Sequence, residues 1–211
     1  MMWFDSAWIL GAYLAGSVPF GYLWVKLARG RDIRTMGSGN IGATNVARAA
    51  GGLAGACVFA LDVAKGWAPA WTYGRWAAHQ GIAAPWAAIG VGLAALAGHC
   101  FPVWLSFKGG KGVATGFGVL LAFFPLAAFL TLAVWGLSAV ATRYVSVSSI
   151  LAALSLPLWL FLGLSGAGRD RGPWLLFAVI CAAAVVMRHA GNVRRLVNGT
   201  EPRMGTGGKT E

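Results

Sequence analysis

The stretch HCFPVWLSFKGGKGVAT at residues 99–115 combines cations with glycines. The cations are Lys108 and Lys111, and the neighbouring glycines are Gly109, Gly110 and Gly112. Glycines let backbone N–H groups approach a ligand closely, and lysines add positive charge. The alternative is that the lysines only anchor the chain at a membrane surface, but an anchor needs no flexible backbone. The stretch therefore favours a phosphate-binding site.

This glycine-lysine stretch does not complete a nucleotide-binding P-loop. That pattern requires glycine six residues before the lysine and serine or threonine directly after it. The chain has Leu105 and Gly112 at those positions. We therefore do not expect ATP hydrolysis.

The first polar stretch in chain order, GSGNIGATNVAR, covers residues 37–48 and contains the pattern G-x-G-x-x-G, and the glycine-lysine stretch is the second. A dinucleotide-binding fold would need a buried strand before it, but the preceding residues RGRDIRTM are polar and basic. We reject that reading and expect hydrogen-bonding groups with a cation for an anion: Ser38, Gly39, Asn40, Gly42, Thr44, Asn45 and Arg48. The alternative is a loop that touches lipid headgroups, which rarely needs so many small and amide residues.

A third stretch, RHAGNVRRLVNGTE, covers residues 188–201. Arg188, His189, Asn192 and Arg195 are its candidate functional residues, and we expect Glu201 to be structural and to bridge arginines such as Arg195. Histidine at a helix end can simply cap carbonyls. For His189 the polar neighbours favour function, whereas for His99 the two readings weigh equally.

Asp62 and Lys65 lie three residues apart in an apolar run, on one helical face where they can pair. Each charge in a membrane span costs about 2.5–3.5 kcal/mol, which pairing and inward facing would offset. A structural ion pair near the active surface is at least as well supported as direct chemistry.

The elements that must position these residues are apolar. The chain is 58% hydrophobic and 11% charged, whereas soluble domains have roughly 25% charged residues. We expect an all-α integral membrane protein with one domain over residues 1–211 and a frayed tail from about residue 203. The net charge of +11 lies between apolar runs, which fits cytoplasmic loops or anionic substrates rather than nucleic acid. The cysteines show no disulfide or metal spacing.

Charge favours seven spans, several of them short. Residues 113–142 are too many for one span and too few for two full ones, and Pro125 indicates a break. Seven spans place 13 basic residues on the cytoplasmic side and three outside. Six spans would place nine basic residues on the cytoplasmic side and seven outside. The positive-inside rule thus favours seven spans, an outside N-terminus and a cytoplasmic C-terminus. The expected spans are 3–27, 53–73, 84–98, 113–124, 126–142, 147–164 and 174–187.

All three stretches resemble those of the bacterial acyl-phosphate:glycerol-3-phosphate acyltransferases, the PlsY family. The similarity covers nearly the whole chain, and the second stretch, extended to Gly98, is long and specific. The segment LDVAKG at residues 61–66 is also similar.

The resemblance implies transfer of a fatty acyl group from acyl phosphate to the sn-1 hydroxyl of glycerol 3-phosphate. The products would be 1-acylglycerol 3-phosphate and phosphate, with no cofactor or metal. It implies a bacterial cytoplasmic membrane location with the site facing the cytoplasm, and it is compatible with a monomer. The catalytic candidates are Ser38, Arg48, His189 and Asn192. The glycine-lysine stretch would bind glycerol 3-phosphate, and we include His99 among the substrate-binding candidates.

Two other classes remain open from the residues alone. Carriers of organic phosphates also bind anions with glycine-broken helices and basic residues, although their sites tend to lie near the bilayer midplane between repeats. A scaffold that binds anionic lipid would tolerate Lys111→Arg, whereas a shaped phosphate site should not.

Overall fold

The computed structural model describes residues 2–82, 85–164 and 170–205, and the regular elements in these ranges are all helical. The chain divides into two compact units, residues 1–122 and residues 123–206. The all-helical class predicted from the apolar runs is confirmed.

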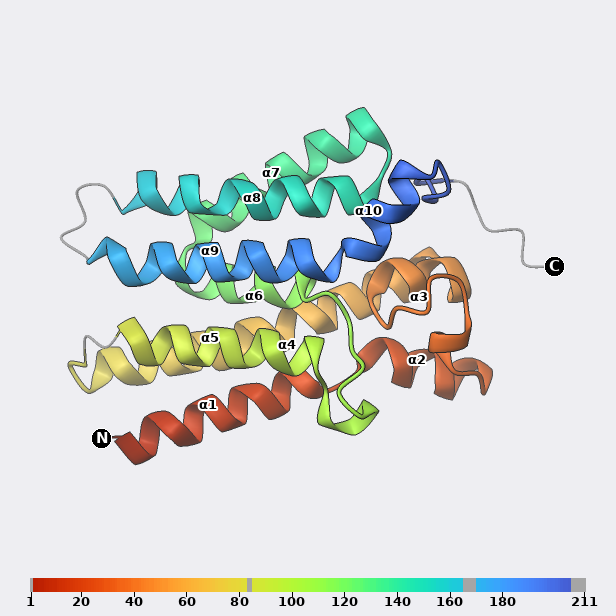
Figure 1. The fold of residues 1–211 in the computed structure, drawn as a ribbon. Coiled ribbons are helices and arrows are strands. Elements are labelled where there is room, and N and C mark those ends of the chain that lie inside the picture. The colour runs from red at the N-terminus through yellow and green to blue at the C-terminus, as the bar shows by residue number, and fades with distance from the viewer. Residues whose placement is uncertain (1, 83–84, 165–169, 206–211) are drawn as a thin grey trace. The chain divides into compact units, whose positions relative to one another are not determined.

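The first unit is built from five α-helices and most of a sixth, together with two short 3₁₀ helices, η1 and η2 (Figure 1). In chain order they are α1 (Met2–Ser17), α2 (Phe20–Arg29), η1 (Ile33–Thr35), α3 (Ala43–Ala50), α4 (Gly52–His79), α5 (Pro85–Cys100), η2 (Val103–Leu105) and α6 (Val113–Phe123). The second unit holds α7 (Pro125–Thr142), α8 (Val145–Gly163), α9 (Arg171–Arg188) and α10 (Ala190–Val197).

The predicted span from Trp3 to Leu27 lies within one segment, residues 3–29, that is long and apolar enough to cross a membrane, but two helices form it rather than one. Helix α1 ends at Ser17 and α2 begins at Phe20. Pro19 has no backbone N–H and disfavours helical geometry at Val18, so the hydrogen-bond ladder stops there. The break leaves the carbonyl of Val18 available to a side chain from another helix.

The predicted break inside residues 113–142 is confirmed. Helix α6 ends at Phe123, and Pro125 opens α7 at a position where its missing N–H costs nothing. Five segments of the described chain are long and apolar enough to cross a membrane, whereas α6 is apolar but shorter. These segments are residues 3–29, 85–105, 125–142, 145–163 and 171–188.

Glycines allow the helices of the first unit to approach closely. A Cβ at Gly16 of α1 would collide with the carbonyl of Ala95 in α5, and one at Gly98 would collide with the carbonyl of Tyr13. Helices in membranes associate largely through such small-residue contacts, because lipid tails are as apolar as the side chains. The contact fixes the end of α5, where the second polar stretch begins.

The same kind of contact joins α4 and α6 and gives a stability prediction. A Cβ at Gly118 would overlap the carbonyl of Val63, so Gly118→Ala should lower stability by about 1–3 kcal/mol. Gly136→Ala is the matched control, because a Cβ there meets nothing within 4 Å. Thermal unfolding in detergent checks this. An equal fall in unfolding temperature for both variants would contradict the close packing of α4 and α6.

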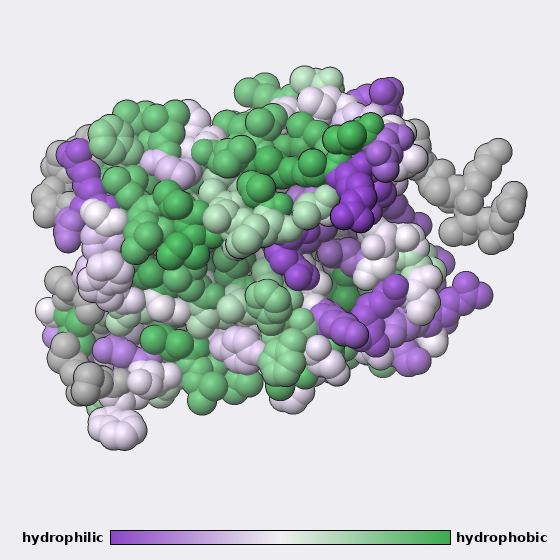
Figure 2. Space-filling model, viewed as in Figure 1, coloured by the Kyte–Doolittle hydropathy of each residue, from purple (hydrophilic) through white to green (hydrophobic). Residues whose placement is uncertain are grey.

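Apolar and polar surfaces are separated within each unit. In Figure 2, hydrophobic residues cover much of the long helices, and hydrophilic residues gather near α2 and α3 in the first unit and near α10 in the second. The hydrophilic surface of the first unit thus lies near the first polar stretch and that of the second unit near the third, whereas the second stretch also exposes large apolar side chains such as Trp104 and Phe107.

Candidate active site

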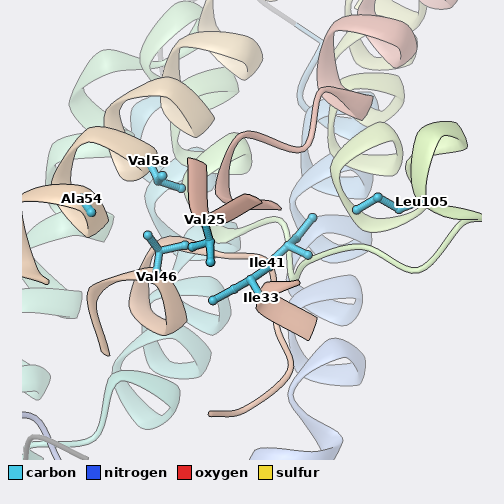
Figure 3. Packing of buried hydrophobic residues seen from close by; sticks show 7 residues of the cluster. All are labelled: Val25, Ile33, Ile41, Val46, Ala54, Val58 and Leu105. Carbon is cyan, nitrogen blue, oxygen red and sulfur yellow. The ribbon is translucent and has the colours of Figure 1, made fainter. Parts of the chain in front are cut away.

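A cluster of buried aliphatic residues supports the first polar stretch. It joins α2, the loop around η1, α3, α4 and η2 (Figure 3), and its members are Val25, Ile33, Ile41, Val46, Ala54, Val58 and Leu105. Leu105 belongs to the second stretch. The cluster thus brings the first two polar stretches together in one packed unit.

Asn45 holds the first stretch in shape. Its side chain is buried, and its Oδ1 accepts the N–H of Ser38 at 3.0 Å. Its Nδ2 lies within hydrogen-bonding distance of three carbonyls, those of Met36 at 3.0 Å, Asn40 at 2.9 Å and, more weakly, Ile33 at 3.4 Å. We had expected Asn45 to bind substrate, but its amide is occupied by the loop backbone. Its role in this structure is to position the loop.

The remaining residues of the first stretch surround this buried amide. Asn40 Oδ1 accepts the N–H of Gly42 at the entrance to α3, and Gly39 has a φ of 69°, which favours glycine. The side chains of Ser38 and Thr44 are exposed. Arg48 lies in the last turn of α3. The side chains of Ser38 and Thr44 are thus open to a substrate, and the contacts predicted for Gly39, Asn40, Gly42 and Arg48 stay predictions.

The second stretch folds back on the end of α5. The N–H of Gly110 donates to the carbonyl of His99 at 3.0 Å, and that of Gly109 donates to the carbonyl of Cys100 at 3.2 Å. A Cβ at Gly110 would collide with Nε2 of His99. Lys108 is exposed and Lys111 is half-buried. The two lysines therefore flank a backbone segment that is held against a histidine ring.

The expected pair between Asp62 and Lys65 is present inside α4. Lys65 Nζ lies 2.8 Å from Asp62 Oδ1, and both side chains are buried. His99 of α5 is buried beside them, with Nδ1 3.6 Å from the same carboxylate oxygen. Sequence spacing revealed the first contact but not the second, because His99 lies on a different helix.

Glu201 is the centre of the third stretch, which lies in the second unit. Its Oε2 accepts from Arg195 at 2.8 Å, so the expected bridge is present. Its Oε1 accepts from Asn192 at 2.6 Å and from Ser146 at 2.7 Å. The sequence analysis missed Ser146, which is 55 residues away from Glu201 and carries no motif. The carboxylate thus fixes the amide of Asn192 and the guanidinium of Arg195.

His189 lies where α9 meets α10. Its ring is buried, and Nδ1 lies 2.7 Å from the carbonyl of Val185. A carbonyl can only accept, so Nδ1 carries the proton, and in the neutral ring Nε2 is the basic nitrogen. Arg188 is the last residue of α9. The geometry therefore leaves Nε2 as the atom of His189 that could take a proton.

Stability should depend on pH through Glu201. Burial alone would raise the pKa of this carboxyl, but hydrogen bonds from Asn192, Ser146 and Arg195 outweigh burial and hold the pKa below its usual range. A carboxyl with a lowered folded pKa stabilises the fold above its unfolded pKa, and that contribution is lost as the pH falls through the folded value.

Glu201→Gln should therefore unfold at a lower temperature than the unchanged protein at pH 7. The difference in unfolding temperature between the two proteins should narrow as the pH falls below about 4. Thermal unfolding in detergent from pH 7 to pH 3 measures this. Asp170→Asn is the control, because Asp170 caps only the start of α9. A gap that stays constant with pH would contradict the role of the Glu201 charge.

Comparison with known proteins places this arrangement in a family. The model of the glycerol-3-phosphate acyltransferase family matches residues 6–199. The chain belongs to this family. The glycerol-3-phosphate acyltransferase of Desulforamulus reducens is 45% identical over 93% of this chain and 94% of its own length. That of Gloeobacter violaceus is 44% identical over 92% of both chains. The resemblance seen in the three stretches is confirmed.

Solved structures of this acyltransferase family are similar along nearly the whole chain. The crystal structure of PlsY (YgiH), an integral membrane glycerol 3-phosphate acyltransferase, in its glycerol 3-phosphate form has a TM-score of 0.86 and 42% identity over 96% of both chains. Its lysophosphatidic acid form has a TM-score of 0.82 and 40% identity over 96% of both chains. The membrane character predicted from composition agrees with this similarity.

Proposed function

We propose that this protein transfers a fatty acyl group from acyl phosphate to the sn-1 hydroxyl of glycerol 3-phosphate. Family membership and the similarity to PlsY, whose structures include glycerol 3-phosphate and lysophosphatidic acid forms, support the acceptor and the product. An organic phosphate carrier, the alternative from the residues alone, gains no support from these relatives. The choice of acyl phosphate as the donor rests on the resemblance of the three stretches to the acyl-phosphate-dependent acyltransferases.

One observation carries the proposal. The backbone of Gly109 and Gly110 is held against the end of α5, with Lys108 and Lys111 on either side. Because those backbone N–H groups hold the segment in place, the two lysines are fixed in advance and can stabilise a phosphate without reorganisation when the substrate arrives. We assign glycerol 3-phosphate to this stretch, from Lys108 to Gly112, and we assign further phosphate contacts to Arg48, Arg188 and Arg195.

In the proposed reaction the sn-1 hydroxyl oxygen attacks the acyl carbonyl carbon. The resulting tetrahedral oxyanion then collapses, the bond from carbon to the phosphate oxygen breaks, and inorganic phosphate leaves. Ser38 and Asn192 would orient the reacting groups and stabilise the oxyanion. The hydroxyl proton would pass to Nε2 of His189. The phosphate of the donor is the other possible acceptor of this proton.

We further propose that the chain is one membrane domain with seven spans. Helices α4 and α6 would cross in addition to the five long apolar segments, with the N-terminus outside and the polar stretches at the cytoplasmic face of a bacterial inner membrane. The positive-inside distribution of lysine and arginine supports this orientation. A monomer would suffice, and the reaction would need no metal or cofactor.

The test is an assay with purified protein in detergent or lipidic mesophase, without added metal. Acyl phosphate with glycerol 3-phosphate should give phosphate and 1-acylglycerol 3-phosphate in equal amounts, and acyl-CoA should give neither. Turnover with acyl-CoA alone would keep the acceptor and discard the donor. Glycerol 3-phosphate binding without turnover from either donor would favour a carrier.

A further inference from the structure

Three ionisable side chains form a buried cluster in the first unit, and the proposed reaction uses none of them. Asp62 and Lys65 belong to α4 and His99 to α5, and their exposed fractions are 2%, 6% and 3%. Charged residues are almost never buried unless they are paired, and those within membrane spans are rarely accidental.

One end of this cluster holds the break between α1 and α2. Lys65 Nζ donates to the carbonyl of Val18 at 2.8 Å and lies 2.8 Å from Asp62 Oδ1. Its ammonium also lies 5.7 Å from the centre of the Phe20 ring. Lys65 therefore binds a carbonyl at the proline break, which also accepts the N–H of Phe20 at 3.1 Å, and it neutralises the Asp62 carboxylate.

The other end of the cluster supports the glycine-lysine stretch. His99 Nδ1 faces Asp62 Oδ1 at 3.6 Å, which is longer than a hydrogen bond but close enough for electrostatic attraction. On the far side of the ring, Nε2 occupies the space where a side chain of residue 110 would project, and the carbonyl of His99 accepts the N–H of Gly110. The contacts therefore run from Val18 through Lys65, Asp62 and His99 to Gly110.

Stability alone gives little reason for such a cluster. Replacing a buried ion pair with apolar residues of similar size is often neutral or stabilising. A polar cluster can instead fix one orientation of a side chain, which an apolar contact does not do. Here the oriented side chain is the His99 ring, and it supports the backbone at Gly110.

We propose that Asp62, Lys65 and His99 are positioning residues that hold the Gly109–Gly112 backbone in its phosphate-binding shape. This revises the expectation that His99 contacts substrate. The identity of the phosphate as glycerol 3-phosphate rests on the proposed function, whereas the effect on the backbone does not.

The test uses the double variant Asp62→Asn, Lys65→Met, which removes both charges and leaves neither buried alone. Its KM for glycerol 3-phosphate should rise about tenfold or more, with the KM for acyl phosphate changed by less than about twofold. Hydrogen exchange at the amides of Gly109 and Gly110 should accelerate in the absence of substrate. Tyr73→Phe is the matched control, since it removes a partly buried hydrogen bond from α4 to Asp5 and should change neither readout.

A purely structural cluster would lower the unfolding temperature while leaving both the exchange and the KM at the values of the unchanged protein, and that result overturns the proposal. If the double variant does not fold, His99→Asn decides, because asparagine keeps a donor toward Asp62 but does not reach Gly110. It should give the same faster exchange. If the unchanged protein shows no acyl transfer, the proposed function fails, and the exchange measurement still judges the positioning role.

Discussion

Gly110→Ala should lower kcat/KM for glycerol 3-phosphate by about a hundredfold or more, because misplacing a bound reactant by about 1 Å can cost that much. The added Cβ would collide with Nε2 of His99, whose ring is buried and confined by Asp62. The ring cannot rotate away without breaking the buried cluster. The backbone between Lys108 and Lys111 must therefore move, and with it the two lysines proposed to meet the phosphate.

Gly116→Ala is the matched control for this change. Its Cβ would meet only Leu96 Cδ1 at 3.7 Å, an ordinary contact distance. Steady-state kinetics with acyl phosphate at saturation, together with thermal unfolding, should show Gly116→Ala unchanged and Gly110→Ala folded but inactive. If Gly110→Ala retained most of its activity, the backbone at this glycine would not be part of the binding site.

The two proline breaks show what could be predicted about the fold. Pro125 lies in an apolar run of 30 residues. That length is too great for one span, so it already predicted a break in the helix. Pro19 lies in a run whose length suits a single span, so length gave no reason to divide it. The break there is shown by the structure, in which α1 ends at Ser17 and α2 begins at Phe20, and the carbonyl of Val18 between them accepts from Lys65.

The site shows the same division between local and distant contacts. The Asp62–Lys65 pair could be predicted because residues three apart meet on one helix face. The contact of Asp62 with His99 and that of Glu201 with Ser146 could not, because each joins residues far apart in the sequence. Asn45 was predicted to bind substrate, and the structure shows its amide bonded to its own loop. An amide in a motif does not show whether it faces substrate or its own loop.

His189→Asn tests the proposed proton acceptor, and kcat should fall by more than about a hundredfold, because general-base catalysis is worth about 10²–10⁴. The Nδ2 of asparagine can replace Nδ1 as the donor to the carbonyl of Val185, which lies 2.7 Å from the histidine nitrogen. The variant should therefore keep the junction of α9 and α10 while losing the basic Nε2. Because asparagine removes only the basic nitrogen, KM for glycerol 3-phosphate should change by only a few fold.

His79→Asn is the control for this prediction, since His79 is exposed at the end of α4, and it should behave as the unchanged protein. The decisive comparison is between kcat and unfolding temperature for His189→Asn. A large loss of kcat at an unchanged unfolding temperature assigns the proton to His189. A loss of only a few fold in folded protein would exclude it, and the leaving phosphate of the donor would then be the group that accepts the hydroxyl proton. In that case the protein's contribution would be to position two phosphates, and the larger effects would be found at Gly110 and the lysines beside it.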